Sequence, residues 1–210
     1  DSPRSEVLTP ASEAEIRSWV KRSPATADQH PFMHHILKLL ILTGARSGEA
    51  RLARWCDIDL HKRIWTVPVS KNGRARRIVL SGAAVELLHE IRERNAVFHL
   101  STRQDEYVFQ NPRFRRPYNC IFSSWERIRQ GAGLPNVRIH DLRHSFAVRR
   151  LVLWHEQGVD VGQQMLALST YLGHVKVSST YWYLTGVPEL MGLLGQAFER
   201  YASPWEDGDE

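Results

Sequence analysis

The sequence predicts a mainly α-helical (α+β) domain that contains one small antiparallel β-sheet. Apolar residues recur with helical spacing through most of the chain, which favours helices packed on one another. Two β-type runs flank an Asn-Gly pair, the usual signal of a hairpin. The length of 210 residues and the lack of an internal repeat favour a single domain.

The first half of the chain supplies two helix signals. Ser12 and Glu15 are spaced like the two ends of a capping box, so a helix is expected to begin there. Residues 31–42 form a nearly all-apolar helical run, which predicts a buried core helix that ends at Gly44. Ser47 is then expected to cap a short helix.

The remaining elements follow in order. Residues 64–69 and 75–80 are the predicted hairpin strands, and Ser81 is expected to cap a helix that runs to about Arg94. Residues 107–110 read as one short strand. From Tyr118 onward the pattern is helical, with breaks at glycine-containing segments.

Composition excludes several classes of protein. Hydrophobic residues make up 42% and charged residues 24% of the chain, which is ordinary for a globular protein and not for a disordered one. The longest apolar run, 36–42, is broken by Lys38 and falls well short of the ~20 residues of a membrane span. For that reason we expect no membrane partner. Cys56 and Cys120 are too few for a disulfide framework, so we expect a reducing, cytoplasmic setting.

The net charge of +5 comes from 28 basic and 23 acidic residues, and the basic ones cluster. A basic surface suits a polyanion, because each neutralised phosphate releases counterions, although a solvated basic face would look the same. The three clusters are Lys71, Arg74, Arg76 and Arg77; Arg113, Arg115 and Arg116; and Arg138, Arg143, Arg149 and Arg150.

Three short segments, 42–49, 140–146 and 172–183, place arginine, histidine and tyrosine side chains beside buried apolar runs. The guanidinium of arginine can bind two oxygens of one phosphate at once. Lysine and histidine can transfer protons, and tyrosine can form a covalent intermediate. No acidic cluster or His/Cys spacing suited to a divalent metal accompanies them, so no metal or other cofactor is expected. These residues indicate phosphoryl transfer on an anionic backbone.

In this order, the three segments resemble the tyrosine recombinase (phage-type integrase) family, over about residues 8–201 as its C-terminal catalytic domain. The family's motifs are a T-G-x-R-x-x-E pattern, a hairpin lysine, an H-x-x-R pair, an L-G-H turn and a tyrosine nucleophile. The matching residues are Arg46 with its supporting Glu49, Lys71, His140 and Arg143, His174, and Tyr183.

The resemblance implies a site-specific DNA recombinase. Tyr183 would attack a scissile phosphate of double-stranded DNA, a 3′-phosphotyrosine would form, and a free 5′-hydroxyl would leave. Lys71 would be the general acid, and His140 would assist the proton of the tyrosine. The resemblance implies that Arg46, Arg143 and His174 stabilise the charged transition state, without ATP or metal. It also implies a homotetramer acting on two duplexes.

Several alternatives stay open at the level of single residues. Tyr181 is a rival nucleophile, but on a helix it points about 200° away from Tyr183, so one site cannot use both. Lys71 could be a simple phosphate clamp, and Arg46 could merely pair with Glu49 across a helical turn. We expect Arg74, Arg76 and Arg77 to contact the DNA backbone, and His144 to be a supporting or structural residue. His30, His34 and His35 are expected to be surface or core histidines.

Wider alternatives concern the whole protein. A type IB topoisomerase would share the same catalytic residues, and a non-enzymatic DNA-binding regulator would not need Tyr183. Family members usually begin with a separate helical DNA-binding domain, which these residues lack, so the chain is either a fragment or a minimal protein. The apolar stripe of residues 188–201 suits packing on its own domain or on a neighbouring protomer. Residues 202–210 are expected to form a solvated acidic tail.

Overall fold

The computed structural model describes residues 14–16, 18, 30–68, 75–174, 176 and 179–180. The chain divides into two compact units. The first comprises Asp1–Phe146 together with Tyr171–Gly173, and the second comprises Ala147–Thr170 together with His174–Glu210. Residues 14–16 and 18 are helical, whereas Ser12, the expected cap, lies outside the described residues.

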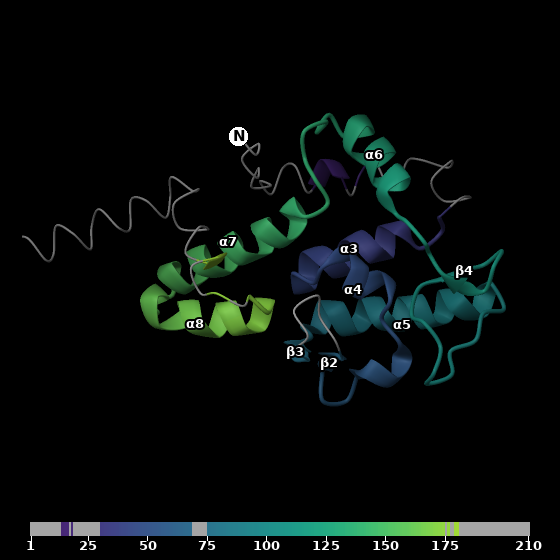
Figure 1. The fold of residues 1–210 in the computed structure, drawn as a ribbon, viewed down its shortest axis with the longest axis horizontal. Helices are drawn as coiled ribbons and strands as arrows, with labels where there is room; N and C mark the ends of the chain where they lie inside the picture. The colour runs from purple at the N-terminus through teal and green to yellow at the C-terminus, as the bar shows by residue number, and fades with distance from the viewer. Residues whose placement is uncertain are drawn as a thin grey trace, which may run out of the picture. The chain divides into compact units, whose positions relative to one another are not determined.

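Helix α3, Met33–Thr43, is the central helix of the first unit and confirms the predicted core helix. It packs against α5, Gly82–Val97 (Figure 1). Gly44 ends α3 in the left-handed conformation, with φ of 62°, and its N–H donates to the Leu40 carbonyl. The buried side chains of α3 are Met33, Ile36, Leu37, Leu39, Leu40 and Thr43.

Helix α4, Ser47–Arg51, begins differently from the prediction. Its N-cap is Arg46, with extended backbone angles, and Ser47 is already the first helical residue. The expected cap at Ser47 is therefore wrong by one position. The reason is that Glu49 accepts a hydrogen bond from the Arg46 backbone N–H, so a carboxylate from the first turn satisfies the helix start.

A three-stranded antiparallel sheet follows, in the order β1-β2-β3. Its strands are β1 (Ile58–Asp59), β2 (Ile64–Val67) and β3 (Arg76–Val79). In β3, Arg76 and Ile78 are buried while Arg77 and Val79 are exposed, as the alternation of a strand requires. The two predicted hairpin strands are confirmed as the pair β2 and β3, and the residues between them, 69–74, lie outside the described part of the chain.

Ser81 caps α5 as predicted, because its hydroxyl oxygen accepts from the Ala84 N–H. The expected strand at 107–110 is mostly absent. Tyr107 forms only an isolated bridge with Arg54, and Val108 donates its N–H to the Ala53 carbonyl. A second, two-stranded sheet instead pairs β4 (Gln110–Asn111) with β5 (Arg116–Pro117), so the described chain holds two small sheets and not one.

The later part of the described chain is helical, as predicted. It contains α6 (Phe122–Gly131), α7 (Asp141–Glu156) and α8 (Val161–Leu172). Gly133, Gly158 and Gly173 all have positive φ and lie just after the ends of these helices, which confirms three of the expected breaks; the fourth, at 186–188, lies outside the described residues. The expected terminal helix at 188–201 and the acidic tail lie outside the described residues.

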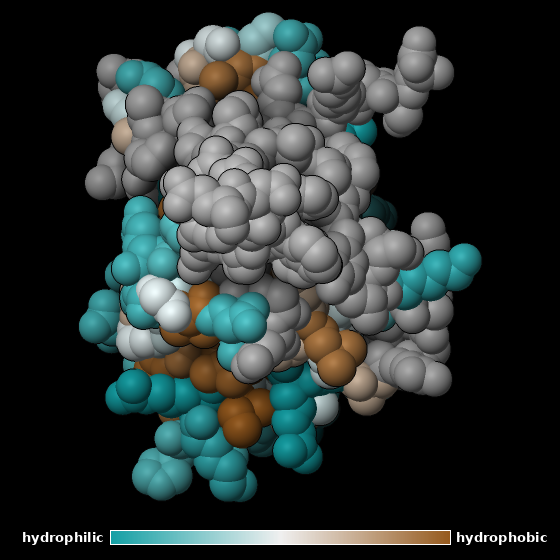
Figure 2. Space-filling model, turned by 90° about the vertical axis from the view of Figure 1, so that its left-hand side faces the viewer, coloured by the Kyte–Doolittle hydropathy of each residue, from teal (hydrophilic) through white to brown (hydrophobic). Residues whose placement is uncertain are grey.

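The core of the first unit is built from large aromatic and aliphatic side chains, among them Phe32, Trp55, Trp65, Phe109 and Trp125. On the described surface visible in Figure 2, hydrophobic areas lie among hydrophilic residues. Within the described residues, no helix has the length and apolar character needed to cross a membrane.

We predict that Gly44→Ala destabilises the protein more than Gly133→Ala. Both glycines have positive φ, which costs an alanine about 1–2 kcal/mol. A β-carbon at Gly44 would also overlap the ring of Phe146, whereas one at Gly133 would meet no atom within 4 Å. Urea unfolding of both variants measures the difference, and equal losses would show that the Phe146 overlap relaxes without cost.

Candidate active site

Arg46 lies where α3 has ended and α4 begins. Its side chain folds back toward α4, and Nη1 donates to Glu49 Oε1 over 2.9 Å. Glu49 Oε2 accepts from the Arg46 backbone N–H over 2.7 Å. One carboxylate therefore holds both the backbone and the guanidinium of Arg46, while 22% of the Arg46 side chain stays exposed.

Glu49 is shared with a second arginine. Arg76 donates from Nη1 to Glu49 Oε1 over 2.6 Å and from Nη2 to Oε2 over 2.8 Å. Burial alone would raise the pKa of Glu49, but hydrogen bonds from the Arg76 side chain and the Arg46 backbone, with the charge of Arg76, lower that pKa to about 2. The carboxylate is therefore ionised at neutral pH.

Arg143 enters from the first turn of α7 and is 2% exposed. Its Nη1 donates to the Gly44 carbonyl over 2.7 Å, and its Nη2 donates to the Leu172 carbonyl. Asp141 fixes the start of α7, because its carboxylate accepts from the Arg138 backbone N–H over 2.8 Å. Arg143 is thus placed by the loop after α3 and by the start of its own helix.

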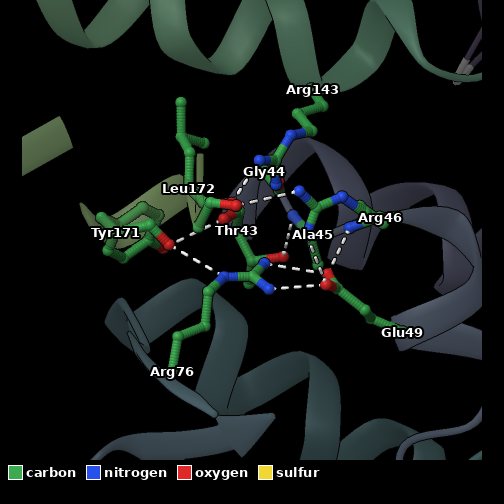
Figure 3. Close-up of polar contacts among 10 residues, drawn as sticks. Thr43, Gly44, Ala45, Arg46, Glu49, Arg76, Arg143, Tyr171 and Leu172 are labelled. Carbon is green, nitrogen blue, oxygen red and sulfur yellow. Dashed lines mark hydrogen bonds and ion pairs between the residues drawn. The ribbon is translucent and has the colours of Figure 1, made fainter. Parts of the chain in front are cut away.

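The three arginines meet at the end of α8. Three consecutive carbonyls there, those of Tyr171, Leu172 and Gly173, accept from Arg76, Arg143 and Arg46 respectively (Figure 3). Helix ends leave carbonyls without intrahelical partners and carry partial negative charge, so cations are favourable at this position. Elements far apart in the sequence thereby place their guanidinium groups side by side.

Tyr171 ties the same segment to the loop after α3. Its hydroxyl donates to the Thr43 carbonyl over 3.0 Å, and its ring stacks on Phe146 with 5.7 Å between ring centroids. These contacts hold the Tyr171 side chain, in addition to the hydrogen bonds that the arginines donate to the 171–173 backbone.

A pocket of about 630 Å³ adjoins Arg46. His140, which immediately precedes α7, also lines it. Desolvation lowers the pKa of His140, as does the positive charge of Arg143, while Asp141 opposes the shift. The pocket is thus lined by a cation and by a histidine whose lowered pKa favours the neutral ring. The remaining lining residues are Ser47, Gly48, Glu49, Leu52, Ala53, Asp57, Trp65, Val67 and Pro68.

Two further histidines were singled out by the sequence. His144 is buried, and that burial lowers its pKa to about 4, so its ring is uncharged at neutral pH. His174 follows Gly173; its Nδ1 forms a hydrogen bond with the Thr180 hydroxyl over 2.7 Å, and its backbone N–H donates to the Ser169 carbonyl.

The structure thus brings Arg46, Glu49 and Arg143 into one cluster. Lys71, Arg74, Tyr181 and Tyr183 lie outside the described residues. Arg77 is exposed on the outer face of β3, and its expected contact with the DNA backbone stays a prediction.

The position of Arg76 does not suit the contact with the DNA backbone that was expected for it. Its side chain is only 6% exposed and is bound to Glu49. The strand period could have revealed this placement, since Arg76 shares the inward face with Ile78 and Leu80. The acceptor role of the Tyr171–Gly173 carbonyls had no signal in the sequence.

The histidines at and before the start of α3 are not among the residues of the arginine cluster. The His30 ring lies 5.0 Å from the Tyr118 ring, and burial is the main cause that lowers the pKa of His35 to about 4. Over the described ranges, no group of three or more His, Cys, Asp or Glu side chains could hold a metal ion.

We predict that Glu49→Gln removes a pH-dependent part of the stability. The pKa of Glu49 is lowered from 4.5 to about 2, so its contribution is complete above pH 4.5 and is lost as the pH falls toward 2. Its size is at most about 3 kcal/mol. Unfolding measured from pH 7 to 2 should show this loss in the wild type and not in Glu49→Gln.

The matched control is Glu126→Gln. Glu126 also accepts two short hydrogen bonds from an arginine, Arg129, but that pair is more exposed, with 30% of the Glu126 side chain accessible. Because water screens such a pair, its removal should change the pH profile much less. Equal effects of the two substitutions would contradict the assignment of the stabilisation to the buried cluster.

Comparison with known proteins places these features in a family. The pattern of the phage integrase family matches residues 7–187. The chain is 33% identical to y4rB of Sinorhizobium fredii, whose name describes an integrase/recombinase, over 80% of this chain and 55% of that protein. It is 32% identical to the tyrosine recombinase XerC of Roseiflexus castenholzii, over 87% of this chain and 55% of that protein. The chain therefore spans about half the length of these relatives.

Among solved structures, the chain resembles the Tn1549 transposon integrase in complex with transposon right end DNA. The TM-score is 0.68 at 16% sequence identity, over 87% of this chain and 62% of that one. This likeness confirms the predicted fold class. Because the family pattern extends over most of the sequence and the fold agrees with it, the chain belongs to the phage integrase family.

Proposed function

We propose that the chain is the catalytic domain of a tyrosine-type site-specific DNA recombinase, which cleaves and rejoins DNA strands through a 3′-phosphotyrosine. The observation that carries the proposal is the cluster that joins Arg46 and Arg143 at the end of α8, with Arg46 lining the same pocket as His140. Family membership indicates the reaction, and the cluster indicates how this chain would stabilise it.

The cluster suits a phosphate whose negative charge grows during the reaction. It contains three arginines and one glutamate, so positive charge is in excess. The arginines are oriented by backbone carbonyls and by Glu49 before any substrate binds. Such preorganised charge stabilises a transition state without a cost of reorganisation at the moment of reaction.

The residues divide the chemistry as follows. The Tyr183 oxygen attacks the phosphorus, the bond to the 5′-oxygen breaks, and Lys71 donates a proton to that oxygen. His140 accepts or orients the proton that leaves the tyrosine. Its lowered pKa supports this role, because a neutral imidazole can take up a proton.

Religation is the reverse reaction. A 5′-hydroxyl attacks the phosphotyrosine, the tyrosine leaves, and the protons return. The phosphotyrosine conserves the energy of the phosphodiester bond, so no nucleotide needs to be hydrolysed. His174 joins the two arginines in stabilising the phosphate, and its bond with Thr180 supports this role by fixing the imidazole ring.

The proposed partners are double-stranded DNA and further copies of the same protein. The complex of the Tn1549 integrase with transposon DNA supports a DNA substrate. Four copies acting on two duplexes would exchange strands, as family membership suggests. The cellular site would then be the cytoplasm of a bacterium, in contact with its DNA.

We predict that Tyr183→Phe abolishes covalent attachment to DNA. The protein is incubated with nicked duplexes, which lose a short fragment after cleavage and so trap the intermediate, and the adduct is observed on a denaturing gel. Loss of the hydroxyl removes the only atom of that side chain that can form the bond, so the adduct should disappear.

Tyr181→Phe is the control and should retain the adduct. An adduct that persists in Tyr183→Phe and vanishes in Tyr181→Phe would move the nucleophile to Tyr181. Absence of any adduct with the wild type, over a range of family target sequences, would contradict the proposed enzyme. Relaxation of supercoiled plasmid without strand exchange would indicate a topoisomerase.

We predict that the β4–β5 hairpin contributes to DNA affinity. The Phe114 ring at its tip is 54% exposed and lies 5.3 Å and 5.0 Å from the guanidinium carbons of Arg113 and Arg116. Replacing Arg113, Arg115 and Arg116 together by alanine should weaken binding to all duplexes alike. The plot of log affinity against log salt concentration should also become less steep. The magnitude of its negative slope should fall by about 1 for each phosphate that the hairpin no longer neutralises.

The control for the hairpin is Arg103→Ala, since Arg103 is also exposed but pairs with Asp105. Fluorescence anisotropy with labelled duplexes at several salt concentrations measures affinity and slope. An unchanged slope in the triple variant would show that the hairpin does not touch the DNA backbone.

A further inference from the structure

Arg76 is a buried cation that adds to the charge of the cluster but has no contact with the substrate in the reaction described above. All three nitrogen atoms of its guanidinium donate hydrogen bonds: Nε to the Tyr171 carbonyl over 2.9 Å, and Nη1 and Nη2 to Glu49. The Glu49 carboxylate compensates the charge of Arg76, whereas Arg143 donates to the neutral carbonyls of Gly44 and Leu172, so Arg76 is the arginine of the cluster least suited to bind a phosphate. Its position calls for another explanation.

Arg76 changes the charge that surrounds Arg46. Arg46 and Arg76 share the single negative charge of Glu49. Without Arg76, that charge would fall on Arg46 alone, and a guanidinium compensated by a carboxylate attracts a phosphate much less. With Arg76 present, the three side chains together keep one positive charge, and Arg46 is the partly exposed member that can direct it at a ligand.

Arg76 also contacts the backbone segment that orients Arg46. Arg76 binds the Tyr171 carbonyl, and the Gly173 carbonyl two residues later accepts from Arg46 over 3.1 Å. Arg76 also packs on Gly173, since a β-carbon there would lie 2.9 Å from Arg76 Cδ. Arg76 therefore contacts both groups that orient the Arg46 guanidinium, namely Glu49 and the 171–173 segment.

We infer that Arg76 is a positioning residue for Arg46: it neutralises Glu49 and fixes the 171–173 segment, so that Arg46 keeps its charge and its direction toward the scissile phosphate. The inference rests on the proposed function, because it assigns a task to Arg46 in the reaction. It separates two neighbours on β3, since Arg77 faces solvent and Arg76 serves the site from within.

A purely structural role of the Arg76–Glu49 ion pair leads to a different expectation. In that case, replacing Arg76 would lower stability, and the folded fraction would cleave DNA at the normal rate. A positioning role predicts slow cleavage by folded protein at saturating DNA, with little change in the DNA concentration that gives half the maximal rate. It also predicts that the defect depends on the charge of Glu49.

The test compares Arg76→Ala, Arg76→Lys and the double variant Arg76→Ala/Glu49→Gln. The measured quantity is the rate of adduct formation on nicked duplex, as a function of DNA concentration and per folded molecule. We expect Arg76→Ala to be about 100-fold slower at saturation, the scale of removing one preorganised charge donor. Arg76→Lys should be intermediate, because lysine retains the charge and lacks the paired geometry.

The double variant is the sharpest measurement. Removing the charge of Glu49 should restore at least about tenfold of the rate lost in Arg76→Ala, because the negative charge that Arg76 neutralised is gone. Lys62→Ala, which removes an exposed ion pair with Asp59 in the same sheet, should cleave at the wild-type rate. Wild-type rates in Arg76→Ala, or a double variant no faster than Arg76→Ala, would overturn the inference.

Two further outcomes, an inactive wild type and an Arg76→Ala variant that does not fold, need a separate measurement. Failure of the wild type to form any adduct would contradict the proposed function itself. In that case, and also if Arg76→Ala does not fold, hydrogen–deuterium exchange of Arg76→Lys tests the positioning role. The amides of Gly173 and His174 should exchange faster than in Lys62→Ala, and unchanged exchange would overturn the inference.

Discussion

The carboxylate of Glu49 accepts hydrogen bonds from the side chains of two arginines, and the candidate site depends on that sharing. A buried carboxylate is costly unless it is paired, and a buried guanidinium is costly for the same reason. Here Arg46 reaches Glu49 from its own helix and Arg76 reaches it from β3, so each charge stabilises the others. The low pKa of Glu49 reflects this balance.

From that centre the arrangement extends to the end of α8. The Tyr171–Gly173 carbonyls accept from Arg76, Arg143 and Arg46, so an α-helix C-terminus anchors three cations in one place. Arg46, the member of the three that lines the pocket, is thereby oriented in the absence of any ligand. Since His174 directly follows Gly173 in the chain, the arginines also fix the segment that precedes a proposed catalytic histidine.

Much of the fold was predictable because local signals decide it. The apolar run before Gly44, the Ser81 cap and the paired β-runs each depend on residues close in sequence, and the structure confirms all three. The cap expected at Ser47 was wrong by one position for a local reason, the hydrogen bond from the Arg46 N–H to Glu49, whereas the strand expected at 107–110 was wrong because of distant partners. Residues 107–110 have the composition of a strand, but the Val108 N–H donates to the Ala53 carbonyl. Of these four residues, only Gln110 belongs to a named strand, β4, which pairs with β5.

The sequence by itself determined the kinds of residue at the site and the family, because short motifs hold Arg46 with Glu49 and His140 with Arg143 within one helical turn. The strand period of β3 also holds the signal that Arg76 faces inward, although its basic neighbours favoured a contact with DNA. Only the tertiary structure decided that Arg76 binds Glu49 and that the Tyr171–Gly173 carbonyls receive the arginines. The physical reason is that hydrogen bonds between elements far apart in the chain depend on how those elements pack, which no local pattern records.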